Sequence, residues 1–149
     1  MSTLVIDTGQ SIVGVYSVGE QEYIGYRGSR IVEAVGRVRN ADEVVTYNGT
    51  FRDLKDLGGF AGIDGDLPLK GKHIDMQRMI WNPIVGTSLI RTYEMHFDNC
   101  PDFPFGRRDS EDCDHYEGGN QRDVYMTLKL WECWKEQKLN LVGYGYTHH

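Results

Sequence analysis

The sequence predicts an α/β domain, a mixed β-sheet flanked by helices. Three observations support this class: β-branched runs at the N-terminus, alternating helical and strand patterns after them, and a strong helical pattern near the C-terminus. A hydrophobic content of 40% is enough for one core, and 149 residues are few for two. We therefore expect one globular domain over residues 1–140. Residues 141–149 are expected to form a tail, whose final histidine pair is typical of an added tag.

The first half of the chain alternates strand and helix patterns. Three β-branched segments joined by short polar turns predict a meander of strands over residues 4–7, 12–18 and 21–27. The next segment predicts a helix that ends near Asn40, because its apolar residues recur at three- and four-residue spacing. These residues are Ile31, Val32, Val35 and Val38. Residues 43–49 then predict a fourth strand.

The second half predicts more helix. Thr50 followed by Asp53 resembles a capping box, which starts a short helix with Phe51, Leu54 and Leu57 on one face. A strand-to-helix passage follows and stops before Pro83, and the segment 87–97 also has a helical pattern. The segment 99–120 is rich in Pro, Gly, Asp and Ser, which predicts a long exposed loop, and residues 121–137 predict a strong helix.

Charge and cysteine content limit the functional classes. The net charge of −6 and the pI of about 5.3 argue against bulk attraction to nucleic acid or anionic lipid, but they allow a phosphate substrate held through bound cations. Three cysteines at no metal-ligand spacing favour a reducing, cytoplasmic location over a disulfide framework. The N-terminal apolar run is interrupted at Asp7, so neither a signal peptide nor a membrane span is expected.

Three aspartates are candidate site residues. Asp7 ends the first predicted strand, Asp53 follows the turn after the fourth, and Asp123 shares the apolar sector of the last helix with two tryptophans. Each also has a purely structural interpretation, as a helix-dipole partner or a capping acid. If the three converge at one end of the sheet, their mutual repulsion favours divalent cations, and the motifs show no fixed Lys or Arg beside them.

These segments resemble the DEDD 3′–5′ exonucleases of the ribonuclease H-like superfamily. LVIDTG is similar to the first motif of that family, and VVTYNGTFRDLKDL to the second, with Arg52 where the family usually has Phe. KHIDMQRMIW is similar to the segment that follows the second motif, and GNQRDVYMTLKLWE to the third. The resemblance spans nearly the whole chain in the expected order, and it implies a ribonuclease H-like fold.

The resemblance also implies a site and an activity. Asp7, Asp53 and Asp123 would be the metal and catalytic residues of a two-ion Mg²⁺ or Mn²⁺ site, and Asn48 would contact nucleic acid. The substrates would be 3′ ends of single-stranded DNA or RNA. Gly9 replaces the Glu of the first motif. Gly118 and Gly119 stand where the third motif has its water-orienting His or Tyr, so Tyr116 or His115, slightly upstream, is the candidate for that role.

Two other functions remain open at this stage. A chain that lacks the Glu and the Tyr is also consistent with a ribonuclease H-like binding or interaction module without catalysis. Alternatively, Asp-Thr-Gly at Asp7 is typical of a homodimeric aspartic protease of the retropepsin type, in which two carboxylates share a proton. Four arginines suggest a basic edge for a phosphate backbone or, more commonly, a solvated helix face: Arg27, Arg30, Arg37 and Arg39.

Overall fold

The computed structural model describes residues 1–80, 88–106 and 115–139, and it has the predicted α/β architecture. Its five strands form one mixed sheet in the order β3-β2-β1-β4-β5. The strands are β1 (Thr3–Gly9), β2 (Ile12–Ser17), β3 (Glu22–Arg27), β4 (Glu43–Thr46) and β5 (Lys72–Asp75). The helices are η1 (Gly28–Arg30), α1 (Ile31–Asn40), α2 (Asp53–Phe60), α3 (Met76–Ile80), α4 (Leu89–Glu94) and α5 (His115–Lys135).

The sheet combines an antiparallel meander with parallel crossovers. β1, β2 and β3 pair antiparallel, as their short polar turns predict. β4 lies parallel to β1 and β5 lies parallel to β4, and each of these connections contains a helix. This arrangement is compatible with a ribonuclease H-like fold. It differs from the small all-β fold that the protease interpretation requires.

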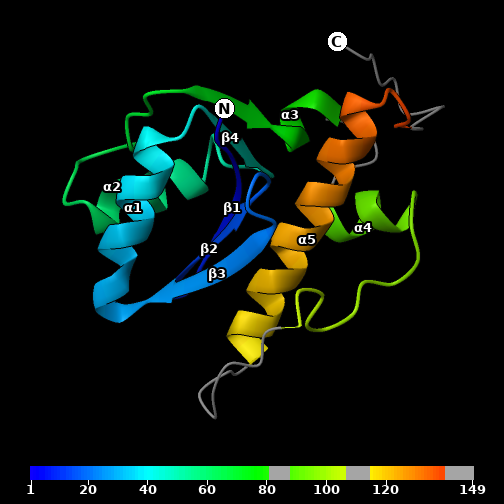
Figure 1. Ribbon diagram of the computed structural model, residues 1–149, viewed down its shortest axis with the longest axis horizontal. Coiled ribbons are helices and arrows are strands. Elements are labelled where there is room, and N and C mark those ends of the chain that lie inside the picture. The colour runs from blue at the N-terminus through cyan, green and yellow to red at the C-terminus, as the bar shows by residue number, and fades with distance from the viewer. Residues whose placement is uncertain (81–87, 107–114, 140–149) are drawn as a thin grey trace.

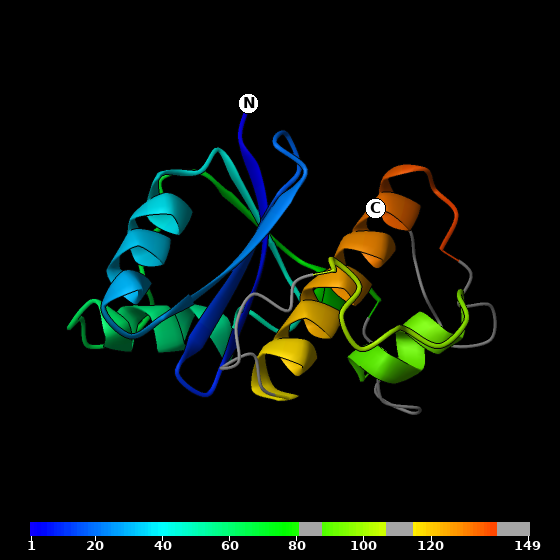
Figure 2. The same ribbon diagram turned by 60° about the horizontal axis from the view of Figure 1, so that its bottom comes forward.

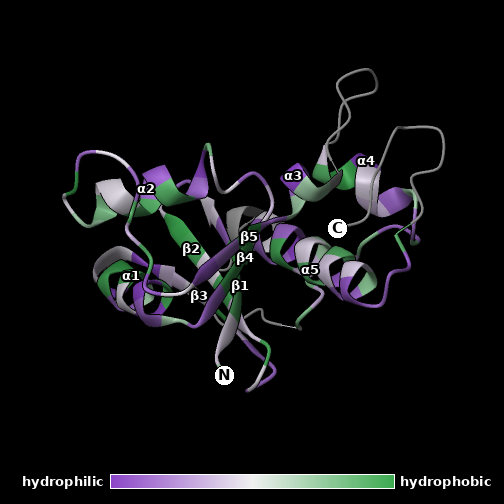
Figure 3. Cartoon of the chain, turned by 90° about the horizontal axis from the view of Figure 1, so that it is seen from above, coloured by the Kyte–Doolittle hydropathy of each residue, from purple (hydrophilic) through white to green (hydrophobic). Residues whose placement is uncertain are grey.

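Helices cover both faces of the sheet (Figure 1). α1 and α2 lie on one face over a core that includes Leu4 and Ile6 of β1. α5 crosses the other face, against a core that includes Val5 of the same strand, and α4 packs beside α5 (Figure 2). Figure 3 shows the hydrophobic strand residues between these two helical layers. Because side chains alternate along a strand, consecutive residues of β1 face different helices.

Several sequence-based predictions are confirmed in detail and others are wrong. Helix α1 ends at Asn40 as predicted, with Ile31 and Val38 buried, but Val32 is 71% exposed. The predicted fourth strand, expected over 43–49, ends at Thr46. The capping box is also wrong: α2 begins at Asp53 itself, and no side chain caps it. Phe51 precedes that helix and is 65% exposed, so it does not share the buried face of Leu54 and Leu57.

The start of α5 departs most from the prediction. The glycines near residues 115–120 predict a loop, but these residues form the first turns of a 21-residue helix. Packing explains this outcome: Gly118 is buried against Phe103, and Asn120 and Gln121 are buried as well. Tertiary contacts here outweigh the low helix propensity of glycine. The side chains of residues 115–117 and the tail at 140–149 lie outside the described part of the structure.

Candidate functional site

Two of the three predicted aspartates line a common cleft. Asp7 of β1 and Asp123 of α5 contribute to an open cavity of about 290 Å³. The other lining residues come from the loop after β4 and from α3 and α4: Tyr47, Asn48, Arg52, Gln77, Ser88, Leu89 and Ile90. The site therefore joins segments from both ends of the chain.

The alternation of β1 decides which partner each residue meets. Asp7 lies on the same face of the sheet as Val5, which is the face covered by α5. Thr8 lies on the opposite face, toward α2, and there its hydroxyl contacts the Asp53 carboxylate. The sequence prediction treats Asp7 and Asp53 as equivalent members of one cluster. In the structure, Asp7 faces α5, whereas Asp53 contacts the next strand residue, Thr8, on the opposite face of the sheet.

Asn120 of α5 fixes the Asp7 carboxylate. Its Nδ2 donates to the main-chain oxygen of Asp7 at 3.0 Å and to Asp7 Oδ2 at 3.3 Å. The hydroxyl of Tyr23 on β3 in turn donates to Asn120 Oδ1 at 2.5 Å. Gly14, the partner of Asp7 across the β1–β2 ladder, leaves the space that the Asn120 amide fills. The resemblance includes Asn120 in the third motif but assigns it no role.

Burial raises the pKa of both cleft carboxylates. The pKa of Asp7 is raised well above its usual value, first by burial and then by the charges of Asp53 and Asp123. Burial also raises the pKa of Asp123, while Arg52, Arg122 and a side-chain hydrogen bond with Asp7 oppose the rise. A hydrogen bond between two carboxyl groups requires a shared proton. Burial therefore disfavours two full negative charges on this pair.

Asp53 lies behind this pair and is almost fully buried, at 1% exposure. Its Oδ1 accepts from the main-chain N–H of Thr8 at 3.3 Å and from the Thr8 hydroxyl at 2.7 Å. The same hydroxyl lies 2.8 Å from Asp56 Oδ2, although it has only one proton to donate. Burial raises the pKa of Asp53 to about 6 against these hydrogen bonds, and its Oδ2 is buried without a hydrogen-bond partner.

Asp75, at the end of β5, organises the loop that carries Asn48. Its carboxylate accepts from the main-chain N–H groups of Asn48 at 2.7 Å, Thr50 at 3.0 Å and Gln77 at 3.1 Å. Asn48 itself adopts a left-handed conformation, with φ of 69°. The Thr50 N–H therefore donates to Asp75, so the first residue of the predicted capping box is bonded to the end of β5. The resemblance includes Asp75 in a matching segment but does not anticipate this role.

Arg52 brings a fixed positive charge into the cleft. Its Nη2 donates to the Thr8 main-chain oxygen at 2.7 Å, and it lowers the pKa of Asp7 and of Asp123. The expectation that no fixed cation stands near the acids is therefore wrong. Within the described residues, no three His, Cys, Asp or Glu side chains are placed to hold one metal ion.

Other predicted residues have different surroundings. The Tyr116 and His115 side chains lie outside the described residues, so their assignment as water-orienting groups stays a prediction. Gly9, at the position of the missing Glu, has little room, because a Cβ there would lie 3.0 Å from Ile12 Cγ2. Gly119 faces open space, with no atom within 4 Å of a Cβ.

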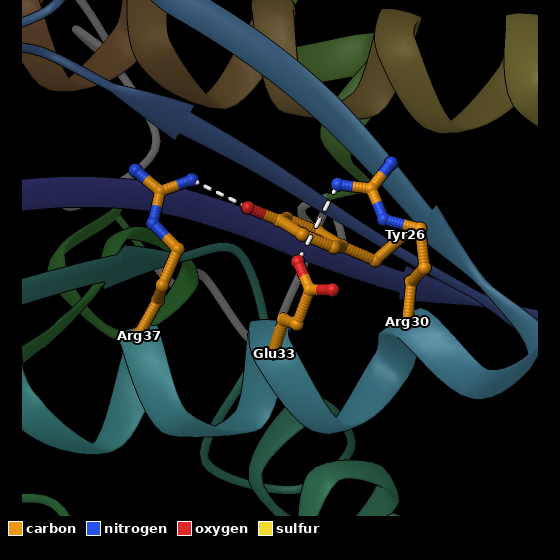
Figure 4. Close-up of polar contacts among 4 residues, drawn as sticks. All are labelled: Tyr26, Arg30, Glu33 and Arg37. Atoms are coloured by element: carbon orange, nitrogen blue, oxygen red, sulfur yellow. Dashed lines mark hydrogen bonds and ion pairs between the residues drawn. The ribbon is translucent and has the colours of Figure 1, made fainter.

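Two arginines of the predicted basic edge, Arg30 and Arg37, contact neighbouring side chains of the protein itself (Figure 4). Arg37 Nη1 donates to the Tyr26 hydroxyl at 2.8 Å, and the Arg30 guanidinium lies over the Tyr26 ring at 5.1 Å from the centroid. Arg30 also pairs with Glu33 at 3.4 Å. These contacts hold the two arginines against β3 and α1, and none of these four residues lines the Asp7–Asp123 cleft.

Comparisons with known proteins identify no family. No protein-family model matches the chain, and no curated protein shows significant similarity to it. Among the helices of the described segments, none combines the length and apolar character that a membrane crossing requires. The geometry of the cleft is therefore the main structural indication of function.

Proposed function

We propose that this protein is a metal-dependent 3′–5′ exonuclease that hydrolyses phosphodiester bonds of single-stranded DNA or RNA. The observation that carries the proposal is the pair Asp7 and Asp123, which line one open cleft and repel each other there. Two carboxylates from a central strand and a crossing helix, at an open cleft of about 290 Å³, are the minimum for metal-assisted phosphoryl-transfer chemistry.

The donor set fits a hard divalent cation. Carboxylate oxygens are the ligands that Mg²⁺ and Mn²⁺ prefer. A bound cation would offset the repulsion from Asp53 and Asp123, which adds to burial in raising the pKa of Asp7. Asp53 Oδ2, buried and without a hydrogen-bond partner, is a third candidate ligand behind the pair. Asp7 and Asp123 are the residues of the cleft that would hold an ion, and Asp53, which does not line the cleft, is the third ligand that the sequence resemblance implies.

The bound ions would activate the attacking water and stabilise the departing oxygen. The chain's own residues orient the reactants. Asn120 donates to both the main-chain oxygen and the carboxylate of Asp7, which restricts the orientation of that carboxylate. Asn48 lines the cleft on a loop whose main chain is bound by Asp75, and we propose that its side-chain amide hydrogen-bonds a base or sugar. Tyr116 is the proposed water-orienting residue.

A second function has specific support. A module that binds nucleic acid without cutting it would retain the acidic cleft but lack a complete set of catalytic groups. Gly9 stands in the place of a ligand, in a position where the neighbouring Ile12 leaves little room, and Arg52 places a permanent positive charge among the acids. These two observations support a module that binds nucleic acid without hydrolysing it.

Labelled single-stranded oligonucleotides separate the two functions. Incubation with Mn²⁺ or Mg²⁺ should shorten the oligonucleotide from its 3′ end, so a 5′-labelled substrate gives a ladder and a 3′-labelled one releases mononucleotide. Asp123→Asn should abolish the product, because the change removes the ligand charge but keeps the shape of the side chain. Glu132→Gln is the matched control, since Glu132 is an exposed acid on the same helix. A product that persists at the same rate in Asp123→Asn would refute the assignment.

A further inference from the structure

Arg52 lines the cleft, yet the proposed chemistry does not use it. It precedes α2, and its main-chain N–H donates to the Asn48 oxygen at 3.1 Å. Its side chain is anchored separately, through the 2.7 Å bond from Nη2 to the Thr8 oxygen. Two attachments, one at each end of the residue, hold the guanidinium beside the strand residue that follows Asp7. The resembling enzymes usually have Phe at this position.

The charge of Arg52 acts on all three candidate acids. Arg52 lines the same cleft as Asp7 and Asp123, and it directly precedes Asp53 in the chain. A guanidinium stays protonated at all accessible pH values, so this contribution is permanent. In chemical terms, Arg52 performs part of the task that a divalent cation would perform, namely charge compensation of the carboxylates.

We propose that Arg52 is a built-in counter-ion of the Asp7–Asp123 pair that competes with divalent cations for this cleft and sets their affinity. The inference rests on the proposed metal site and goes beyond it, because it assigns metal affinity to a residue that is not a ligand. The protein would accept a metal ion only against the repulsion of the guanidinium. Binding should therefore be weak in the unaltered protein and strengthen when the positive charge is removed.

Coulomb's law gives the size of the effect. A divalent and a monovalent cation held within the same small, open cleft repel each other enough to weaken binding by about tenfold in a solvent-like dielectric, and by more where the cleft excludes water. Removal of the Arg52 charge should therefore tighten Mn²⁺ binding by about tenfold. Arg52→Lys should leave the affinity close to that of the unaltered protein, because the charge remains.

Calorimetric titration of the full-length, metal-free protein with MnCl₂ tests the proposal without any activity measurement. Arg52→Gln removes the charge yet keeps a side-chain donor for the Thr8 oxygen, and Arg52→Lys keeps the charge. Arg39→Gln is the matched control for a general loss of one positive charge, since Arg39 is exposed on α1 and does not line the cleft. Circular dichroism establishes that each variant is folded.

The expected result is about tenfold tighter Mn²⁺ binding in Arg52→Gln, with Arg52→Lys and Arg39→Gln unchanged, and loss of the gain when Asp123→Asn is added. Equal or weaker binding in Arg52→Gln, with binding still dependent on Asp123, would overturn the counter-ion role and leave the metal site intact. If no variant binds Mn²⁺ in a manner that depends on Asp123, both the counter-ion role and the proposed metal site are wrong. If Arg52→Gln is unfolded, Arg52→Met takes its place in the same titration, and the same outcomes decide.

Discussion

Gly14→Ala should uncouple α5 from the candidate site. A Cβ at position 14 would overlap Asn120 Oδ1 and lie 2.7 Å from Asn120 Cγ, so the amide must leave its place. The amide is not free to rotate away at little cost, because Tyr23 and Asp7 hold it and Asn120 is only 3% exposed. The substitution therefore removes hydrogen bonds from buried polar groups without altering any of their atoms.

The expected cost follows from those lost bonds. Each buried donor or acceptor left without a partner costs about 1–3 kcal/mol, so displacement of the Asn120 amide should lower the free energy of unfolding by about 2–4 kcal/mol. For a chain of this length the melting temperature should fall by about 5–15 °C. Differential scanning calorimetry and urea titration measure both quantities.

A helix glycine provides the control. Gly36 lies within α1, and a Cβ added there would have no atom within 4 Å, so Gly36→Ala should stabilise the protein by about 0.5–1 kcal/mol. Asn120→Ala, which removes the amide, should cost much less when combined with Gly14→Ala than alone, because both changes break the same bonds. If Gly14→Ala is as stable as the unaltered protein, or if the two costs simply add, the Asn120 linkage is not the one described.

Three other predictions concern stability. Asp53→Asn should flatten the pH dependence of unfolding: burial raises the pKa of Asp53 to about 6, so the folded state retains a proton that the unfolded chain releases near pH 4. In the unaltered protein this group's contribution is therefore present below about pH 4 and lost as pH rises through about 6, a change of about 2–3 kcal/mol, and urea titrations at several pH values measure it. Asp75→Ala should lower the free energy of unfolding by about 3 kcal/mol, because three main-chain N–H groups lose their acceptor. A urea titration in which the variant keeps its full stability would contradict that role of Asp75. Gly58→Ala should lower the free energy of unfolding by about 1–3 kcal/mol, since its Cβ would overlap the Gly65 main-chain oxygen. Gly59→Ala is the control, because a Cβ there has open space and should not destabilise the protein. Equal melting temperatures of the two variants would contradict this packing.

Short-range patterns were sufficient to predict most of the elements. The β-branched runs predicted the meander, and the spacing of apolar residues predicted α1 and its end at Asn40. The helical wheel placed Asp123 on the packing sector of the last helix, and Val124, Leu130 and Trp131 are indeed buried there. These features follow from the sequence because strand and helix periodicities depend only on neighbours along the chain.

The errors arose where distant segments decide local structure. Helix α5 begins at His115, earlier than its glycines suggest, because Gly118 packs against Phe103. The capping box failed where Asp75, 25 residues further along the chain, binds the Thr50 N–H. Propensity and motif rules describe a segment alone, and both segments are stabilised by partners that the rules cannot include.

What the sequence by itself determined is the class of fold and the identity of the candidate acids. Only the tertiary structure decided how those acids are arranged. Asp7 meets Asn120, 113 residues away, while Asp53 turns to Thr8 on the other face of the strand. Arg52, adjacent to Asp53 in sequence, reaches the cleft because the loop after β4 directs it toward Thr8. Local periodicity fixes which face a residue occupies, but the charge balance of a site depends on which faces the folded chain brings together.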